Sequence, residues 1–184
     1  MIKRVTIVFA FAALFATGCM KNNSAGSGMS ATADSMKAAY TATAAAWDAG
    51  KVDEFDKYMS TNTVEHQTMP GQEPGLAGVK KMALMLHAAF PDMKTTIQDM
   101  RVDSNILVAR FTMSGTNSGA MMGMPATNKK MTDVGGIDWV RWENGKFVEH
   151  WGYFDDRAMM SQLGLMPQHP GMPADSGAMG KKGM

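Results

Sequence analysis

The sequence predicts an α+β domain with helices packed on one face of an antiparallel sheet. Apolar residues recur at helical spacing in the first half of the domain and alternate, or cluster in β-rich runs, in the second half. Near the end of the domain, Glu143-Asn144-Gly145 separates two β-rich runs. Asparagine and glycine both tolerate positive φ, so this turn predicts a β-hairpin over residues 135–156.

The N-terminal residues are typical of an exported lipoprotein. A basic start is followed by an apolar run, residues 5–15, that is too short to span a bilayer. Small residues then lead to Cys19, the only cysteine of the chain, in a pattern that resembles a bacterial lipobox. We predict a lipoprotein signal peptide over residues 1–18 and a lipid anchor on Cys19, which would hold the protein in the cell envelope, periplasmic or associated with the outer membrane. The alternative is an ordinary signal peptide cut near Ala16 that leaves a free thiol.

Length and charge limit what the exported chain can be. It suits one domain, expected over residues 34–166. A flexible tether rich in Ser, Gly and Ala would precede it (19–33), and a disordered Met-, Gly- and Pro-rich tail would follow it (167–184). The formal net charge is +1, and no basic stripe is interleaved with aromatic residues. Nucleic acid is therefore not an expected partner.

Helical periodicity marks the first half of the domain. A helix is expected over residues 34–49, a short second one over about 52–59 and a third over about 76–90. Glycine or proline follows each of the two long helices, as it does at many helix ends. Between the second and third helices, residues 61–68 read as an extended segment that carries His66.

Strand patterns fill the second half. Strands are expected over residues 93–102, 106–113 and 131–142, and the return strand of the hairpin follows. Residues 115–130 form a long connection that contains glycine and methionine, which we expect to lie as a loop over an opening. A short helix over 156–165 would close the domain.

The hairpin can form in two registers. A two-residue turn on Asn144 and Gly145 would pair Asp138 with Trp151. A three-residue loop with Gly145 in a G1 bulge would pair Asp138 with His150 instead. We favour the second register because it gives more coherent faces. One face would hold Gly136, Asp138, Val140, Val148, His150 and Gly152. The other would hold Ile137, Trp139, Arg141, Phe147, Glu149 and Trp151, with Arg141 and Glu149 paired diagonally.

Asp138 beside His150 is the best catalytic candidate of the chain. Proton abstraction next to a carbonyl needs a base in a dry site and a second group that stabilises the enolate oxygen. The other interpretation is a polar cross-strand pair that only fixes the register. His66 would add a hydrogen-bond donor if it faces the same cavity, and Trp142 would form part of the pocket wall. The four histidines are scattered, so no metal site is expected.

A set of short segments stands in an order and spacing typical of one family. They are Gly71–Gly75, Ala88–Asp92, Ser114–Thr116, Gly123–Thr127, Gly136–Asp138, Gly145–Lys146 and Glu149–Trp151. Over about residues 38–164 the chain resembles the SnoaL-like polyketide cyclases, also called ester cyclases. The resemblance implies the nuclear-transport-factor-2-like fold, in which a curved sheet and N-terminal helices enclose a conical pocket. It also implies a possible homodimer through the sheet.

The resemblance implies chemistry as well. SnoaL-type enzymes close a polyketide ring by intramolecular aldol condensation, with an aspartate as acid and base and with no metal or cofactor. Carried onto this sequence, Asp138 and His150 would line the pocket from the last two strands and His66 from the segment after the second helix. Two positions depart from the family pattern. Gly152 stands where the catalytic aspartate is expected, and Asn117, which we take as a ligand-binding candidate, replaces a frequent histidine.

Two functions follow from these features. The first is a cofactor-independent cyclase, isomerase or hydrolase that acts on a small apolar carbonyl compound at Asp138 and His150. The alternative is a non-catalytic module that binds a small ligand at the cell envelope. A third class, a purely structural envelope protein, would have its pocket filled by side chains.

Overall fold

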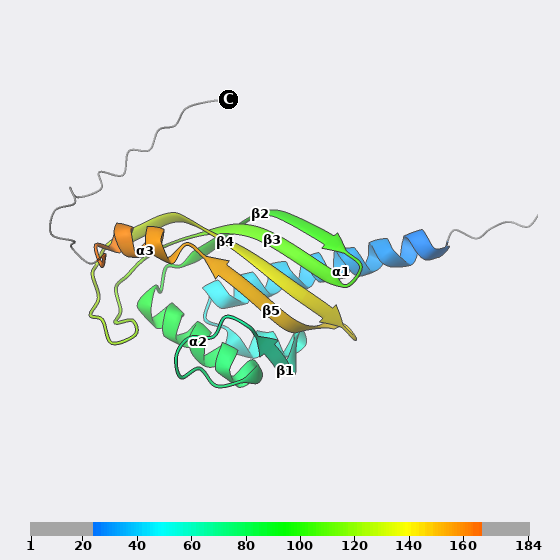
Figure 1. Ribbon diagram of the computed structural model, residues 1–184, viewed down its shortest axis with the longest axis horizontal. Helices are drawn as coiled ribbons and strands as arrows, with labels where there is room; N and C mark the ends of the chain where they lie inside the picture. The colour runs from blue at the N-terminus through cyan, green and yellow to red at the C-terminus, as the bar shows by residue number, and fades with distance from the viewer. Residues whose placement is uncertain (1–23, 167–184) are drawn as a thin grey trace, which may run out of the picture.

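Two layers make up the domain, a five-stranded sheet and the helices that cover one of its faces (Figure 1). The computed structural model describes residues 24–166, with side chains from residue 32 onward. In chain order the elements are α1 (Ser24–Asp48), the 3-10 helix η1 (Val52–Lys57), β1 (Met59–Glu65), α2 (Gly75–Ala89), β2 (Lys94–Asp103), β3 (Ile106–Thr116), β4 (Lys130–Glu143), β5 (Lys146–Phe154) and α3 (Asp156–Leu163). The predicted α+β class and the order of its elements are confirmed.

The sheet has the order β1-β5-β4-β3-β2. Strands β2 to β5 form an antiparallel meander, as predicted. The edge strand β1 pairs with β5 in parallel, so the expectation of a wholly antiparallel sheet is wrong at this edge. Parallel neighbours need a long crossover connection. Here α2 and the first three strands of the meander lie between β1 and β5 in the chain and supply that connection.

Helix α1 packs its apolar stripe on the sheet and runs behind the strands in Figure 1. It begins at Ser24 rather than at Asp34, so helical structure extends into the segment for which a tether was predicted. Met36, Ala39 and Tyr40 are buried against the sheet. Ala39 and Tyr40 follow Met36 by three and four residues, so all three side chains share one face of the helix. The turn ends at Gly50, whose φ of 65° is the left-handed conformation that glycine adopts at a helix end.

The core lies between the helices and the concave face of the sheet. One cluster joins α1 to the middle strands, and its buried members are Met36, Ala39, Tyr40, Leu107, Ala109, Val140 and Phe147. A second joins the end of α2 to α3 and the start of β4, through Ala89, Phe90, Met93, Met121, Met131, Val134 and Leu163. A third holds η1 and α2 against α1, through Ala46, Phe55, Met59, Leu76, Val79 and Ala83. These clusters surround an open space, which forms the candidate site.

The predicted signal peptide, the lipid-modified Cys19 and the tail over 167–184 lie outside the described residues. Within residues 24–166, no helix combines the length and the apolar character that crossing a membrane requires.

Candidate active site

The β4–β5 hairpin sets the geometry of the site. Asn144 and Gly145 have φ of 49° and 81°, so they form a two-residue turn, and Glu143 pairs directly with Lys146. Beyond the next pair the register shifts, and Arg141 lies opposite Glu149. Residue 148 is therefore an extra residue in β5, a β-bulge.

The bulge makes both predicted registers wrong. Asp138 lies opposite Gly152, and His150 lies opposite Val140. Relative to the pairing that the two-residue turn alone would give, the bulge shifts β5 by one residue. Asp138 and His150 therefore still share one face, but as diagonal neighbours and not as a direct pair. Phe147 was predicted on the opposite face but is buried in the core, since the bulge turns it inward.

On the outer face, the bulged register brings Arg141 and Glu149 directly opposite each other. The pair was predicted as a diagonal. The Nε of Arg141 donates to Oε1 of Glu149 at 3.0 Å. This hydrogen bond lowers the pKa of Glu149 below its ordinary value. A charged pair on the solvent side thus holds the strands in the register that positions the inner face.

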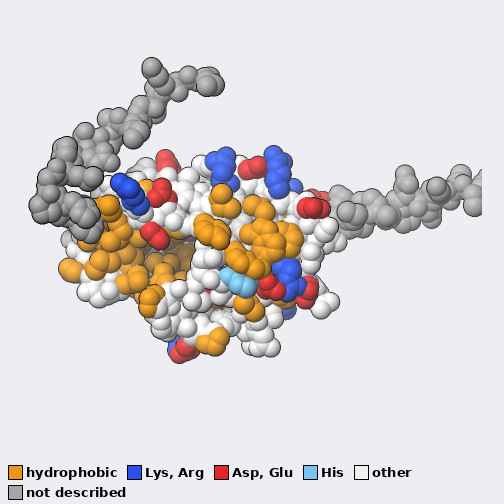
Figure 2. All heavy atoms as spheres, in the orientation of Figure 1, with side chains coloured by type: hydrophobic (Ala, Val, Ile, Leu, Met, Phe, Trp, Pro, Cys, Tyr) orange, Lys and Arg blue, Asp and Glu red, His pale blue; other side chains and the backbone are white. Residues whose placement is uncertain are grey.

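The inner face looks into a cavity of about 320 Å³ between the sheet and helices α1 and α2. Apolar side chains line most of it, and among the described residues these include nine methionines together with Trp47, Phe111 and Phe154. In the space-filling view the surface is hollowed beside such apolar side chains (Figure 2). Methionine is flexible and polarisable, so walls of this kind adapt to ligands of different shape. The cavity contradicts the structural alternative of a pocket filled by side chains.

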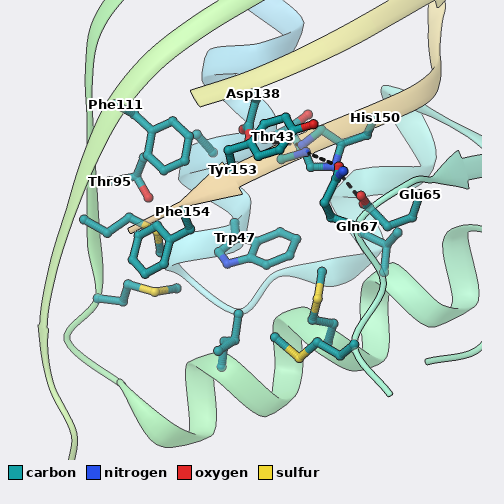
Figure 3. Close-up of a pocket in the computed structure, with 18 of the residues that line it drawn as sticks. Thr43, Trp47, Glu65, Gln67, Thr95, Phe111, Asp138, His150, Tyr153 and Phe154 are labelled. Atoms are coloured by element: carbon teal, nitrogen blue, oxygen red, sulfur yellow. Dashed lines mark hydrogen bonds and ion pairs between the residues drawn. The ribbon is translucent and has the colours of Figure 1, made fainter. Parts of the chain in front are cut away.

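Polar side chains gather at one end of this cavity (Figure 3). The hydroxyl of Tyr40 donates to Oδ2 of Asp138 at 2.6 Å. Nε2 of His150 lies 3.0 Å from Oδ1 of Asp138, and its Nδ1 lies 2.7 Å from Oε2 of Glu65. The side chains are mostly shielded from solvent, with 19% of Asp138, 24% of His150 and 6% of Glu65 exposed. Tyr40, Asp138, His150 and Glu65 therefore form one continuous chain, which we call the polar cluster.

Four elements supply the polar cluster. Tyr40 comes from α1, Asp138 from β4, His150 from β5 and Glu65 from β1. The parallel ladder places Glu65 directly beside His150, and the backbone N–H of His66 then donates to the carbonyl of His150 at 3.0 Å. The parallel edge strand is thus what brings the second carboxylate to the imidazole.

His150 is an imidazolium in this arrangement. Both of its ring nitrogens face carboxylate oxygens, which only accept hydrogen bonds, so each nitrogen must carry a hydrogen. Burial alone lowers the pKa of His150. The hydrogen bonds and charges of Asp138 and Glu65 outweigh that effect and raise the pKa to about 10. Burial, together with the neighbouring Asp138 carboxylate, also raises the pKa of Tyr40, which remains a neutral donor.

Gly152 leaves room for the imidazole. A Cβ built on Gly152 would lie 2.8 Å from Cε1 of His150 and 3.3 Å from Oδ1 of Asp138. A side chain at this position would therefore displace the ring. The family resemblance puts a carboxylate at position 152, and in this chain Asp138 brings one to the same place from the opposite strand.

Two of the predicted ligand-binding residues do not line the cavity. His66 lies on the other side of the sheet, where its ring stacks on Trp151 with centroids 3.8 Å apart and its Nε2 lies 3.4 Å from Glu149 Oε2. Trp142 packs its ring edge against Phe147, with centroids 4.8 Å apart, and belongs to the margin of the core. The expectation that His66 and Trp142 face the ligand is corrected.

Asn117 is a structural residue. It is buried, and its Oδ1 accepts hydrogen bonds from the backbone N–H of Thr127 at 2.9 Å and from the Thr127 hydroxyl at 3.0 Å. Its Nδ2 donates to the carbonyl of Gly119 at 2.8 Å. The side chain thus braces the connection between β3 and β4 instead of meeting a ligand. That connection does reach the cavity, since Met121 and Met122 line it, as expected for a loop over an opening.

Glu65 and Tyr40 are the members of the polar cluster that sequence reasoning missed. In β1, Thr63 and Glu65 point inward while Val64 is 46% exposed and His66 lies outside. Hydropathy suggests the opposite, because valine is the only strongly apolar residue among the four. The one available signal was the alternation of the strand, which puts Glu65 and His66 on opposite faces whichever of them is inside.

Comparisons with known proteins agree with this fold. Residues 37–163 match the family model described as SnoaL-like polyketide cyclase. No curated protein matches the chain. Solved structures do, and TsrD from Streptomyces laurentii is 27% identical with a TM-score of 0.67, over 72% of this chain and 97% of that one.

Two further solved structures show the same fold. A candidate polyketide cyclase from Bacillus cereus is 27% identical with a TM-score of 0.63, over 72% of this chain and 83% of that one. AclR from Streptomyces galilaeus, described as a candidate hydroxylase, is 24% identical with a TM-score of 0.65, over 76% and 87% of the two chains. The curved sheet with helices on one face is thus shared with proteins of more than one described activity.

Proposed function

This chain belongs to the SnoaL-like polyketide cyclase family, and from that premise we propose that it is a cofactor-independent cyclase or isomerase of a small apolar carbonyl compound. One observation carries the proposal. A carboxylate and an imidazolium, Asp138 and His150, sit together at the polar end of an otherwise apolar cavity. A base held in such a place, beside a fixed positive charge, suits proton transfer at a carbon next to a carbonyl.

In the proposed reaction, Asp138 is the base. It takes a proton from the carbon next to the carbonyl, so that a C–H bond breaks and an O–H bond forms on the carboxyl group. The electron pair moves into the enolate, whose negative charge the His150 imidazolium offsets. In a cyclisation the enolate carbon bonds to a second carbonyl carbon, and Asp138 returns its proton to the alkoxide. In an isomerisation the proton returns to a different carbon.

The neighbours of Asp138 suit this role. The Tyr40 hydroxyl on Oδ2 and the imidazolium on Oδ1 fix the orientation of the carboxylate, while the other lone pair of each oxygen is left for the substrate. His150 is the only cationic side chain among the described residues that line the cavity. The apolar walls exclude water, which strengthens each of these electrostatic interactions.

Deuterium exchange tests the proposal without the natural substrate. The probe is 2-tetralone, an apolar bicyclic ketone with acidic α-hydrogens, and NMR in D₂O follows the loss of its α-proton signals. The protein should accelerate the exchange above buffer, and Asp138→Asn should reduce that acceleration by about a hundredfold or more. Asp133→Asn, an exposed change on the same strand, is the matched control and should leave it intact. No acceleration by the unaltered protein, or equal acceleration by Asp138→Asn, would refute the assignment.

The alternative is a binding module that does not turn its ligand over. Gly152 at the expected carboxylate position and the hydrogen bonds already made by both oxygens of Asp138 favour it. Saturable binding of 2-tetralone without any accelerated exchange would support the module over the enzyme.

The location and the assembly are further proposals. We propose that Cys19 carries a lipid that anchors the protein in the cell envelope, in which case Cys19→Ser should move it from the membrane fraction to the soluble one.

We also propose a homodimer through the outer face of the sheet, where Val64 and Ile137 are each 46% exposed and an apolar patch adjoins a histidine side chain (Figure 2). Light scattering should give twice the monomer mass, and Ile137→Glu should reduce it to the monomer.

A further inference from the structure

One oxygen of Glu65 has no use in the polar cluster. Oε2 of Glu65 bonds to His150, but Oε1 is buried and has no hydrogen-bond partner among the described residues. The Glu65 side chain is 6% exposed, and Glu65 lines the cavity. A buried carboxylate oxygen that lacks a partner is costly, so such atoms usually meet one when the site is filled.

The charge of the cavity wall also favours a ligand that donates a hydrogen bond. The acidic residues that line it are Glu65, Asp138 and Asp156, and His150 is the one positive group among the described lining residues, with no lysine or arginine. Within the polar cluster, two carboxylates face one imidazolium, which leaves one net negative charge at the polar end of the cavity. An anionic ligand would be repelled there, whereas a ligand that donates a hydrogen bond would find an unused acceptor.

We propose that the cavity selects apolar ligands that carry a hydrogen-bond donor, either a hydroxyl or an ammonium group, and no negative charge, with Oε1 of Glu65 accepting the donor hydrogen. This inference rests on the proposed function only in placing the substrate in the same cavity. It names what the substrate carries besides its carbonyl group. It also gives Glu65 a second role, since the donor bond orients the ligand while Oε2 positions His150.

Four naphthalenes that differ in one group test the selection. The probes are 2-naphthylmethanol, 2-naphthylmethylamine, 2-methylnaphthalene and 2-naphthoate, and their affinities are measured by calorimetry at pH 7. The alcohol and the ammonium compound should bind at least about tenfold more tightly than the methyl compound, as expected for a hydrogen bond to a charged acceptor. The carboxylate should bind most weakly. The comparison of alcohol with amine tells whether donation alone or donation with positive charge is selected. Equal affinity for the alcohol and the methyl compound would overturn the proposal.

Variants assign the effect to Glu65. In Glu65→Gln the advantage of the alcohol over the methyl compound should fall to about threefold or less, while the affinity of the methyl compound stays unchanged. Asp156→Asn, which removes a carboxylate elsewhere on the wall, should keep the advantage. If circular dichroism shows that Glu65→Gln is unfolded, Glu65→Asp replaces it, because the shorter side chain cannot reach His150 and the ligand together. An advantage that survives in the folded variant would contradict the role of Glu65.

These binding ratios do not depend on turnover. Donor selection together with no deuterium exchange of 2-tetralone would leave the inference standing and refute the enzyme. Deuterium exchange without donor selection would support the enzyme and refute the inference.

Discussion

The protonation of His150 should make the stability of the fold depend on pH above neutrality. Histidine in an unfolded chain has a pKa of about 6.5, and that of His150 in the folded protein is about 10. Because the pKa of His150 is higher in the folded protein than in the unfolded chain, its protonation stabilises the fold. This stabilisation is fully present below the pKa of the unfolded chain. That stabilisation is then lost as the pH rises through the interval up to the folded value. Linkage over this shift gives a loss of about 3 kcal/mol in the free energy of unfolding between about pH 6 and 9.

Urea unfolding followed by tryptophan fluorescence measures this loss. The unaltered protein should lose about 3 kcal/mol between pH 6 and 9, whereas His150→Gln, which has no titrating ring, should change by less than about 1 kcal/mol. The Tyr40 hydroxyl does not interfere, because burial and Asp138 raise its pKa above the ordinary tyrosine value and so out of this interval. Equal stability of the unaltered protein at both pH values, or the same loss in His150→Gln, would refute the imidazolium.

Two substitutions test the geometry. Gly152→Ala places a Cβ 2.8 Å from the His150 ring. It should lower the pKa of His150 toward about 6.5, as NMR titration would show, and it should slow deuterium exchange about tenfold or more. Gly135→Ala on β4, where a Cβ meets nothing within 4 Å, should change neither the pKa nor the exchange rate. Asn117→Ala removes the hydrogen bonds that brace the β3–β4 connection and should cost about 2–4 kcal/mol in urea unfolding, while a loss under about 0.5 kcal/mol would contradict its bracing role.

The hairpin could be predicted from the sequence, but the favoured three-residue loop and the register beyond the turn were wrong. Asn144 and Gly145 specify a hairpin by their own conformational preference. The bulge at residue 148 depends instead on Phe147, which turns inward to join the core beside Val140. That choice is made by packing against distant elements. Asp138 and His150 share a face because of the bulge at residue 148, which the predicted three-residue loop did not include.

Edge strand β1 was the hardest part of the site to predict. Its parallel pairing with β5 joins segments that are far apart in the chain, and no local signal encodes it. The faces of this strand are also hard to assign, because a buried Glu65 and an exposed Val64 reverse the usual hydropathy rule. Burial of Glu65 becomes understandable only once His150 lies beside it as a charged partner. His66, which the sequence offered as a ligand-binding candidate, lies on the other side of the sheet.

The central claim is that an imidazolium sits between two carboxylates at the polar end of the cavity. NMR of protein with ¹⁵N-labelled histidine at pH 8 tests it most directly, because an ordinary histidine is neutral there. We expect both ring nitrogens of His150 to carry hydrogen at that pH, and the signal to revert to a neutral ring in protein that carries both Asp138→Asn and Glu65→Gln. A neutral His150 ring in the unaltered protein, with one nitrogen free of hydrogen, would contradict the claim.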